Sequence, residues 1–281
     1  MTPLVTAAVL LAAVTHAGWN AIAHRIGDKL VGFALICGGG LLIGLATTPF
    51  VAFPAGPAWP LLLASAAVHI VYYLLLMTSF RLADFGQAYP LARGSAPLVV
   101  TVLAAVFAHE VPGAWVSAGI AVSCLGLTGV SLWGLRGTRP NRAAVGAALA
   151  TGLAIAAYTV VDGLGVRAAH SPLGYIAWLM VVQGSAVPML LYARERGATV
   201  RVLRPYAGLG LLGAALSFSA YALVLWAQTR AALAPIAALR ESSIIVGAAI
   251  GALLFKERFG APRIAAAALL VLGIGLMLSA G

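Results

Sequence analysis

The chain is a succession of apolar runs of about 20 residues, separated by short segments that hold most of its charged residues. About 20 residues of α-helix, rising about 1.5 Å each, cross the roughly 30 Å hydrocarbon core of a bilayer. Lipid offers no partner to backbone polar groups, so such runs predict transmembrane helices. We expect an all-α polytopic membrane protein with ten spans, over residues 3–23, 30–53, 60–80, 86–108, 113–135, 143–165, 172–192, 205–229, 232–255 and 261–280.

The composition excludes a soluble protein, because 62% of the 281 residues are hydrophobic, 9% are charged and the mean hydropathy is +1.03. The net charge of +10 predicts no nucleic-acid partner, since the basic residues lie in short loops between spans. Thirteen of the 17 follow spans one, three, five, seven and nine, which predicts that these loops face the cytoplasm. We expect a multi-pass protein of the cell membrane, the bacterial inner membrane.

Residues 88–113 are repeated at residues 235–260 with a constant offset of 147 and no gap. The offset aligns Arg93 with Arg240 and Ser95 with Ser242, so spans four and five recur as spans nine and ten. This predicts two five-helix repeats, residues 1–135 and 143–281, joined by a basic linker at 136–142. Because five is odd, the repeats are inverted in the membrane, as is typical of secondary transporters. A channel or a flippase would also suit the repeat.

The second half resembles EamA-type members of the drug/metabolite transporter superfamily. The resemblance rests on the polar and aromatic segment Ser217 to Tyr221, the turn at Arg230 and the small-residue span that ends in FKERFG at 255–260. It implies a transporter of ten spans in two halves, over the whole chain. The sequence departs from the family at Lys256, where a glycine is usual, and at Ile244, which aligns with Pro97. The segment HAGWN at 16–20 resembles a subgroup associated with phosphonate utilisation.

Charged residues inside spans are costly and normally face a cavity or a partner. Arg93 and Arg240 are therefore candidates to bind the negative group of a substrate; the alternative is a structural role, pairing with carbonyls or with Glu241. Glu241 follows Arg240 directly, so the two side chains point about 100° apart on a helix. Its carboxylate is a candidate for a substrate amine or a coupled proton, or for an ion pair with a neighbouring helix.

The remaining candidates are polar or aromatic residues within spans. On span one a polar stripe must face protein or water. Histidine titrates near neutral pH, so His16 and His69 are candidate proton carriers, or simply hydrogen-bonded residues. Tyrosine and serine suit a site lined by rings and hydroxyls, whereas packing is the alternative for the tryptophan. The full set of candidates is His16, Trp19, Asn20, His69, Tyr72, Ser217 and Tyr221.

Two acidic residues are expected to be structural. Asp162, close to the end of span six, is expected to form a surface pair with Arg167 or a helix-end charge. Glu110 stands at the beginning of span five, where the helix N-terminus stabilises a carboxylate. Cys37 and Cys124 lie in apolar segments without metal-ligand spacing, so neither a disulfide nor a metal site is expected.

Together these features predict a secondary transporter of a small polar metabolite, an amino acid, an aminophosphonate or a similar anion or zwitterion, that works by alternating access. The alternatives are a flippase for a lipid or lipid-linked headgroup and a multidrug or organic cation exporter. An enzyme is not expected, because HExxH, Asp-rich metal motifs and GxSG with a histidine on another span are lacking. We expect no cofactor. The expected partners are the substrate, membrane lipid and a proton as candidate coupling ion, with the chain a monomer or a homodimer.

Overall fold

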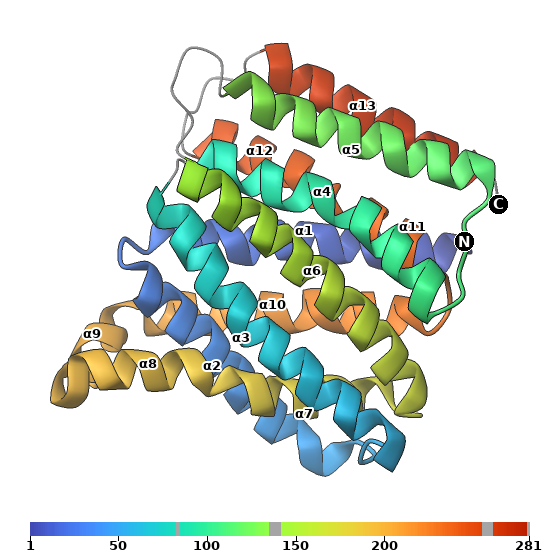
Figure 1. Ribbon diagram of the computed structural model, residues 1–281. Helices are drawn as coiled ribbons and strands as arrows, with labels where there is room; N and C mark the ends of the chain where they lie inside the picture. The colour runs from blue at the N-terminus through green and yellow to red at the C-terminus, as the bar shows by residue number, and fades with distance from the viewer. Residues whose placement is uncertain (83–84, 135–141, 255–260, 280–281) are drawn as a thin grey trace. The chain divides into compact units, whose positions relative to one another are not determined.

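The computed structural model describes the chain except residues 83–84, 135–141, 255–260 and 280–281. All regular secondary structure in the described residues is helical (Figure 1). Nearly all of the predicted linker and the motif at 255–260 lie outside the described residues. The helices are α1 (Pro3–Arg25), α2 (Lys29–Thr47), α3 (Trp59–Leu82), α4 (Phe85–Phe107), α5 (Ala114–Gly134), α6 (Arg142–Ala168), α7 (Pro172–Gly184), α8 (Ala186–Glu195), α9 (Thr199–Leu203), α10 (Ala207–Gln228), α11 (Leu233–Arg240), α12 (Ser243–Leu254) and α13 (Ala261–Ser279).

Each predicted span overlaps one of these helices or a consecutive pair. The span expected at 172–192 is two helices, α7 and α8, interrupted at Ser185. The span expected at 232–255 is likewise two helices, α11 and α12, interrupted at Glu241 and Ser242. Each was predicted as one span, and apolar composition did not reveal that the helix within it is broken.

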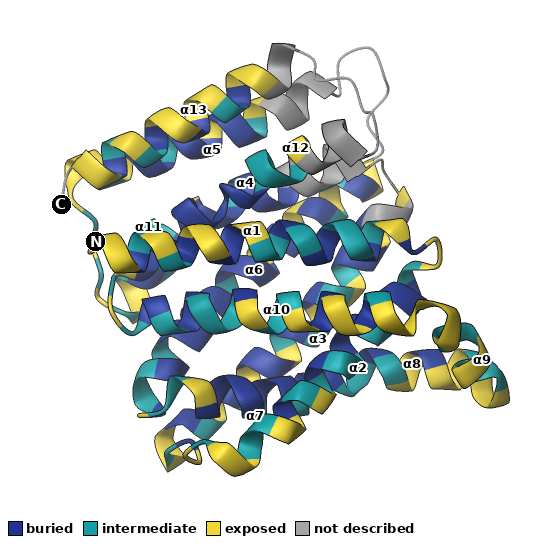
Figure 2. Cartoon of the chain, turned by 180° about the vertical axis from the view of Figure 1, so that it is seen from behind, coloured by how far each residue is buried: buried dark blue, intermediate teal, exposed yellow. Residues whose placement is uncertain are grey.

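Five helical stretches in the described residues are long and apolar enough to cross a membrane: Pro3–Arg25, Lys29–Phe50, Gly56–Ser79, Arg142–Ala168 and Pro172–Gln228. Shorter apolar helices cover Ala92–Phe107, Ala114–Gly129 and Ile264–Ser279. Many large apolar side chains on these helices are exposed (Figure 2), which suits a surface in contact with lipid. The chain is therefore a multi-span membrane protein.

The chain divides into two compact units, each drawn from segments on both sides of the predicted linker. Unit 1 comprises Met1–Leu10, Val71–Val160 and Ala231–Gly281, and unit 2 comprises Leu11–Ile70 and Val161–Arg230. The predicted repeats, residues 1–135 and 143–281, are defined by sequence alignment and not by contacts. The two compact units therefore do not test them, and the repeats stay a prediction.

In unit 1, α5 packs against α13 and α4, and α11 packs against α4. Small residues permit these contacts. A Cβ on Gly119 would lie 2.5 Å from the carbonyl oxygen of Gly273, and one on Gly152 would lie 2.6 Å from that of Ala92. Helices in lipid gain stability from such close backbone approach.

In unit 2, α2 packs against α7, α8 and α10. Its glycines make the contacts: a Cβ on Gly39 would lie 2.5 Å from the Cβ of Ala214 in α10, and one on Gly44 would lie 2.7 Å from the carbonyl oxygen of Ala177 in α7. The glycine run at 38–40 does not break α2, which is one helix from Lys29 to Thr47. These glycines therefore serve helix packing.

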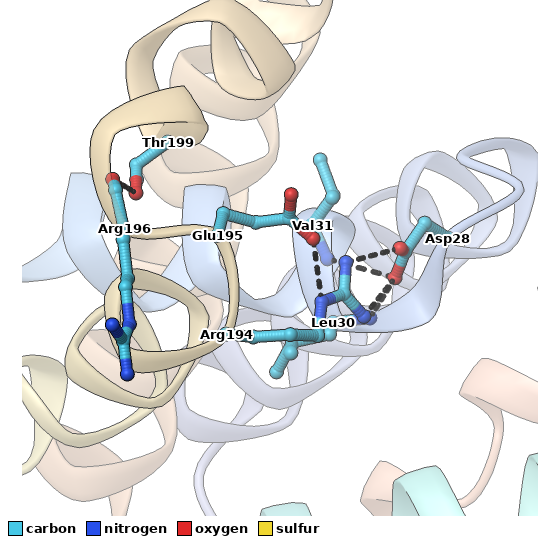
Figure 3. Close-up of polar contacts among 7 residues, drawn as sticks. All are labelled: Asp28, Leu30, Val31, Arg194, Glu195, Arg196 and Thr199. Carbon is cyan, nitrogen blue, oxygen red and sulfur yellow. Dashed lines mark hydrogen bonds and ion pairs between the residues drawn. The ribbon is translucent and has the colours of Figure 1, made fainter.

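Asp28 caps the N-terminus of α2 and pairs with Arg194 at the end of α8 (Figure 3). Its Oδ1 accepts hydrogen bonds from the backbone N–H groups of Leu30 (2.9 Å) and Val31 (3.3 Å). Partial burial acts to raise the pKa of Asp28, but the hydrogen bonds from Arg194 and the backbone and the guanidinium charge outweigh it, so that pKa is lowered. The pair joins the loop after α1 to the end of α8, and both segments belong to the basic loops expected to face the cytoplasm.

Gly39→Ala should destabilise the protein, because the added methyl group meets the Cβ of Ala214 with no room to move. Overpacking of this kind costs about 1–3 kcal/mol, and we expect a lower melting temperature in detergent. Gly208→Ala in α10 is the matched control, since nothing lies within 4 Å of its Cβ position. Equal melting temperatures for the two variants would contradict the packing role of Gly39.

Gly197→Cys, placed in the basic segment after α8, should not react with a membrane-impermeant maleimide in intact cells, and should react once the cells are permeabilised. Gly56→Cys, on the loop before α3, should react from outside. Both positions are exposed, and the native Cys37 and Cys124 are buried, so the background should be low. Labelling in the reverse order would invert the predicted orientation.

Candidate functional site

The interruption between α11 and α12 is a tightened turn in the backbone. The N–H of Glu241 bonds the carbonyl of Ala238 and that of Ser242 bonds the carbonyl of Leu239, both at 3.1 Å, so the hydrogen bonds run from residue i to i−3. A stretch of this type inside a helix often marks a functional hinge. Broken helices occur in membrane proteins where they are buried in protein or line a cavity.

The short helix α11 is stabilised from outside its own sequence. Its N-cap, Ala232, has no capping side chain, but Oε2 of Glu110 accepts a hydrogen bond from the backbone N–H of Leu233 at 2.7 Å. Glu110 was expected to serve the helix that follows it; α5 begins only at Ala114, so its bond to α11 corrects that assignment. Arg240 lies in the last turn of α11, where a positive charge interacts favourably with the negative end of the helix dipole.

Arg93 of α4 and Glu241 of the interruption form a buried ion pair. Nε of Arg93 lies 2.7 Å from Oε2 of Glu241, and Nη2 lies 2.9 Å from Oε1. The two side chains are 2% and 1% exposed. This two-bond geometry satisfies the carboxylate with a planar guanidinium and is among the stronger forms of ion pair. The pair agrees with the structural alternative for Arg93; a role in substrate binding stays a prediction.

Three polar groups beside this pair are buried without a hydrogen-bond partner among the described residues. They are Nε of Arg240 and the hydroxyls of Ser242 and Ser243. The three residues are 4%, 8% and 1% exposed. Buried polar atoms are nearly always bonded, so three unbonded donors within four residues require an explanation.

The candidates on α1 bond mainly to one another. Nε1 of Trp19 donates to Nδ1 of His16 at 3.2 Å, and Nδ2 of Asn20 donates to the carbonyl of His16 at 2.8 Å. The indole of Trp19 also packs edge-on against Phe33, with ring centroids 6.5 Å apart. The polar stripe predicted on this helix is therefore a local hydrogen-bonded group in unit 2.

Asp162 is the main residue that the sequence did not single out as functional. It is fully buried in α6, and its carboxylate accepts hydrogen bonds from the hydroxyls of Tyr175 (2.9 Å) and Tyr221. The expected pair with Arg167 is wrong: residues five apart point to different faces of a helix, and Nε of Arg167 donates instead to the carbonyl of Gln228. In the sequence, this group is indicated by the two tyrosines, because a buried tyrosine hydroxyl needs a hydrogen-bond partner.

His69 belongs to the same group through its contact with Tyr221. Its Nδ1 is 3.1 Å from the hydroxyl of Ser65, and its ring meets that of Tyr221 edge-on with centroids 5.5 Å apart. The structure thus brings two of the predicted site residues, His69 and Tyr221, together around Asp162. Ser217 lies one turn before Tyr221 on α10 and is half-buried.

Tyr72 belongs to unit 1, as do Arg93, Arg240 and Glu241. It is buried among aromatic rings, with centroids 5.2 Å from Tyr73 and 5.4 Å from Tyr158. The described residues contain no group of three or more His, Cys, Asp or Glu side chains able to hold a metal ion.

Residues 142–279 match the model of the EamA-like transporter family. The second half of the chain, residues 142–279, belongs to the EamA-like transporter family. This places it among the membrane transporters of the drug/metabolite transporter superfamily, as the sequence resemblance predicted, and families of this kind are transporters rather than enzymes. A protein of known crystal structure has the same fold: the TM-score is 0.76 at 16% identity, over 100% of this chain and 99% of that chain. No curated protein matches the chain.

Glu241→Gln should strongly destabilise this EamA-type transporter, since it leaves the guanidinium of Arg93 buried without a countercharge. Removing one partner of a buried pair costs about 3–5 kcal/mol, which should appear as a large fall in melting temperature. The double variant Arg93→Met with Glu241→Met should recover much of that loss, because it removes both charges. A single variant as stable as the wild type would show that water or lipid already solvates Arg93.

Proposed function

We propose that this protein is a secondary transporter that moves a small polar metabolite across the bacterial inner membrane by alternating access between two inverted five-helix halves. The observation that carries the proposal is the interrupted helix α11–α12, which has two arginines and a carboxylate buried at or against the break. In secondary transporters, discontinuous helices of this kind form the substrate and ion sites. Family membership supports transport.

The buried charges favour an anionic or zwitterionic substrate. A guanidinium is permanently charged and grips a carboxylate or phosphonate with parallel hydrogen bonds. Amino acids and aminophosphonates carry such a group together with an amine. The resemblance of residues 16–20 to a phosphonate-associated subgroup fits the same substrates.

An organic cation exporter is the second candidate, and the surroundings of Asp162 favour it. The carboxylate is buried beside the rings of Tyr175, Tyr221 and His69, and rings around a negative charge suit an organic ammonium group. A flippase would instead need a path for lipid headgroups. A proton remains our proposed coupling ion, with His16 and His69 as candidate carriers.

Transport by the purified protein in liposomes tests the function. We expect wild-type protein to catalyse counterflow of radiolabelled glycine, alanine or 2-aminoethylphosphonate. Arg93→Lys and Arg240→Lys should each weaken the apparent affinity roughly tenfold, since one charge-assisted bond is lost. Because the halves alternate, the two variants should differ between the two sides of oriented liposomes.

Arg194→Lys, which changes an exposed arginine outside the proposed site, is the matched control and should keep wild-type affinity. Counterflow of choline but not of the amino acids would favour the cation exporter. Lipid scrambling without solute counterflow would favour the flippase.

A further inference from the structure

Among the described residues, the junction between α4 and α11–α12 holds two buried arginines but a single carboxylate. Arg93 and Arg240 are 2% and 4% exposed, and Glu241 is bonded to Arg93 through both of its oxygens. No hydrogen bond or ion pair joins Arg240 to another described residue, and its Nε is buried without a partner. A buried charge normally has a countercharge, so the junction lacks one negative group.

The sequence repeat explains why only one carboxylate is present. The 147-residue offset aligns Glu241 with Gly94, directly after Arg93. A Cβ on Gly94 would lie 2.8 Å from the Cβ of Leu127 and 3.2 Å from the backbone nitrogen of Thr128. The first copy therefore has no room for an acidic side chain, and the two copies are chemically unequal: the glutamate of the second neutralises the arginine of the first.

The other unpartnered groups at the junction can also donate hydrogen bonds. The hydroxyls of Ser242 and Ser243 are buried without partners, and Ser243 is the first residue of the 12-residue helix α12. The backbone N–H groups here are already bonded: those of Ser242, Ile244 and Ile245 donate to the carbonyls of Leu239, Glu241 and Ser242. The side chains are therefore the groups left to bind a ligand. The guanidinium carries a fixed positive charge and only donates hydrogen bonds, and both hydroxyls can donate beside it, so the three side chains together favour a negative oxygen.

We propose that the interruption between α11 and α12 is an oxyanion site, in which the side chains of Arg240, Ser242 and Ser243 bind one carboxylate, phosphonate or phosphate group. In the conformation described, Arg93 is paired with Glu241 and holds the junction in position, so Arg240 is the arginine that binds the group. The bound oxyanion supplies the missing negative charge. This assignment rests on the proposed transport function and narrows it to substrates that carry an acidic group.

Thermal unfolding of the purified full-length protein in detergent tests the site without a transport assay. Sodium acetate, methylphosphonate and phosphate are titrated at constant ionic strength, with choline chloride as the cationic probe. A ligand that binds the folded state raises the melting temperature. We expect at least one oxyanion to do so, and choline to have no effect.

Ser242→Ala with Ser243→Ala, and separately Arg240→Gln, should weaken the apparent affinity for that oxyanion by roughly tenfold or more. Ser123→Ala is the matched control, because its hydroxyl is also buried without a partner but lies on α5, outside the interruption. It should leave oxyanion affinity unchanged. The serine pair keeps the test informative if Arg240→Gln does not fold.

Equal oxyanion stabilisation in the wild type and the serine double variant would overturn the site, as would stabilisation by choline alone. Stabilisation by phosphatidylglycerol but by no small oxyanion, lost in the same variants, would support the site and identify the oxyanion as a lipid headgroup. The outcome is separable from that of the transport assay. Oxyanion binding without counterflow would reject transport and keep the site, whereas counterflow with unaltered binding in the variants would reject the site alone.

Discussion

The cost of burying the guanidinium of Arg93 constrains the rest of unit 1. A charge taken out of water must find a countercharge with good geometry, and Glu241 supplies it from a segment 148 residues away in the chain. The pair excludes water only because the helices around it pack closely. Gly152 lets α6 approach the backbone of α4 at Ala92, and Gly94 lets α4 approach α5. The buried ion pair therefore depends on the small residues that let these helices approach one another.

The two serines that follow Glu241 help to explain why α11 ends where it does. Serine is a modest helix former, and two serines follow Glu241, so a tightened turn costs little at this point. A helix of eight residues is too short to be stable alone, since helix nucleation is unfavourable. Its ends are therefore held by charged groups, with Glu110 bonding the N–H of Leu233 and Arg240 at the C-terminus.

Apolar runs predicted the helical class and the approximate bounds of the helices, because the bilayer dictates the length of an apolar segment. They could not predict the interruption at Glu241 and Ser242, since the segments on both sides of it are apolar and together have the length of one span. The burial of Asp162 could not be predicted from the sequence of its own helix either. Its partners Tyr175 and Tyr221 lie on other helices, and nothing in the local sequence distinguishes a carboxylate bonded by them from one at a helix end.

The glycine contacts of α2 and the α11–α12 junction differ in whether they allow a change of conformation. In unit 2 the glycines of α2 leave no gap against its neighbours, and a close-packed contact has a single arrangement. At the α11–α12 junction, by contrast, three buried donors have no acceptor among the described residues, which costs free energy. A ligand that satisfies these donors binds best to the conformation that presents them together. Such differential affinity is what allows ligand binding to shift a conformational equilibrium, so the interruption, rather than the glycine contacts, is where binding can drive a change of state.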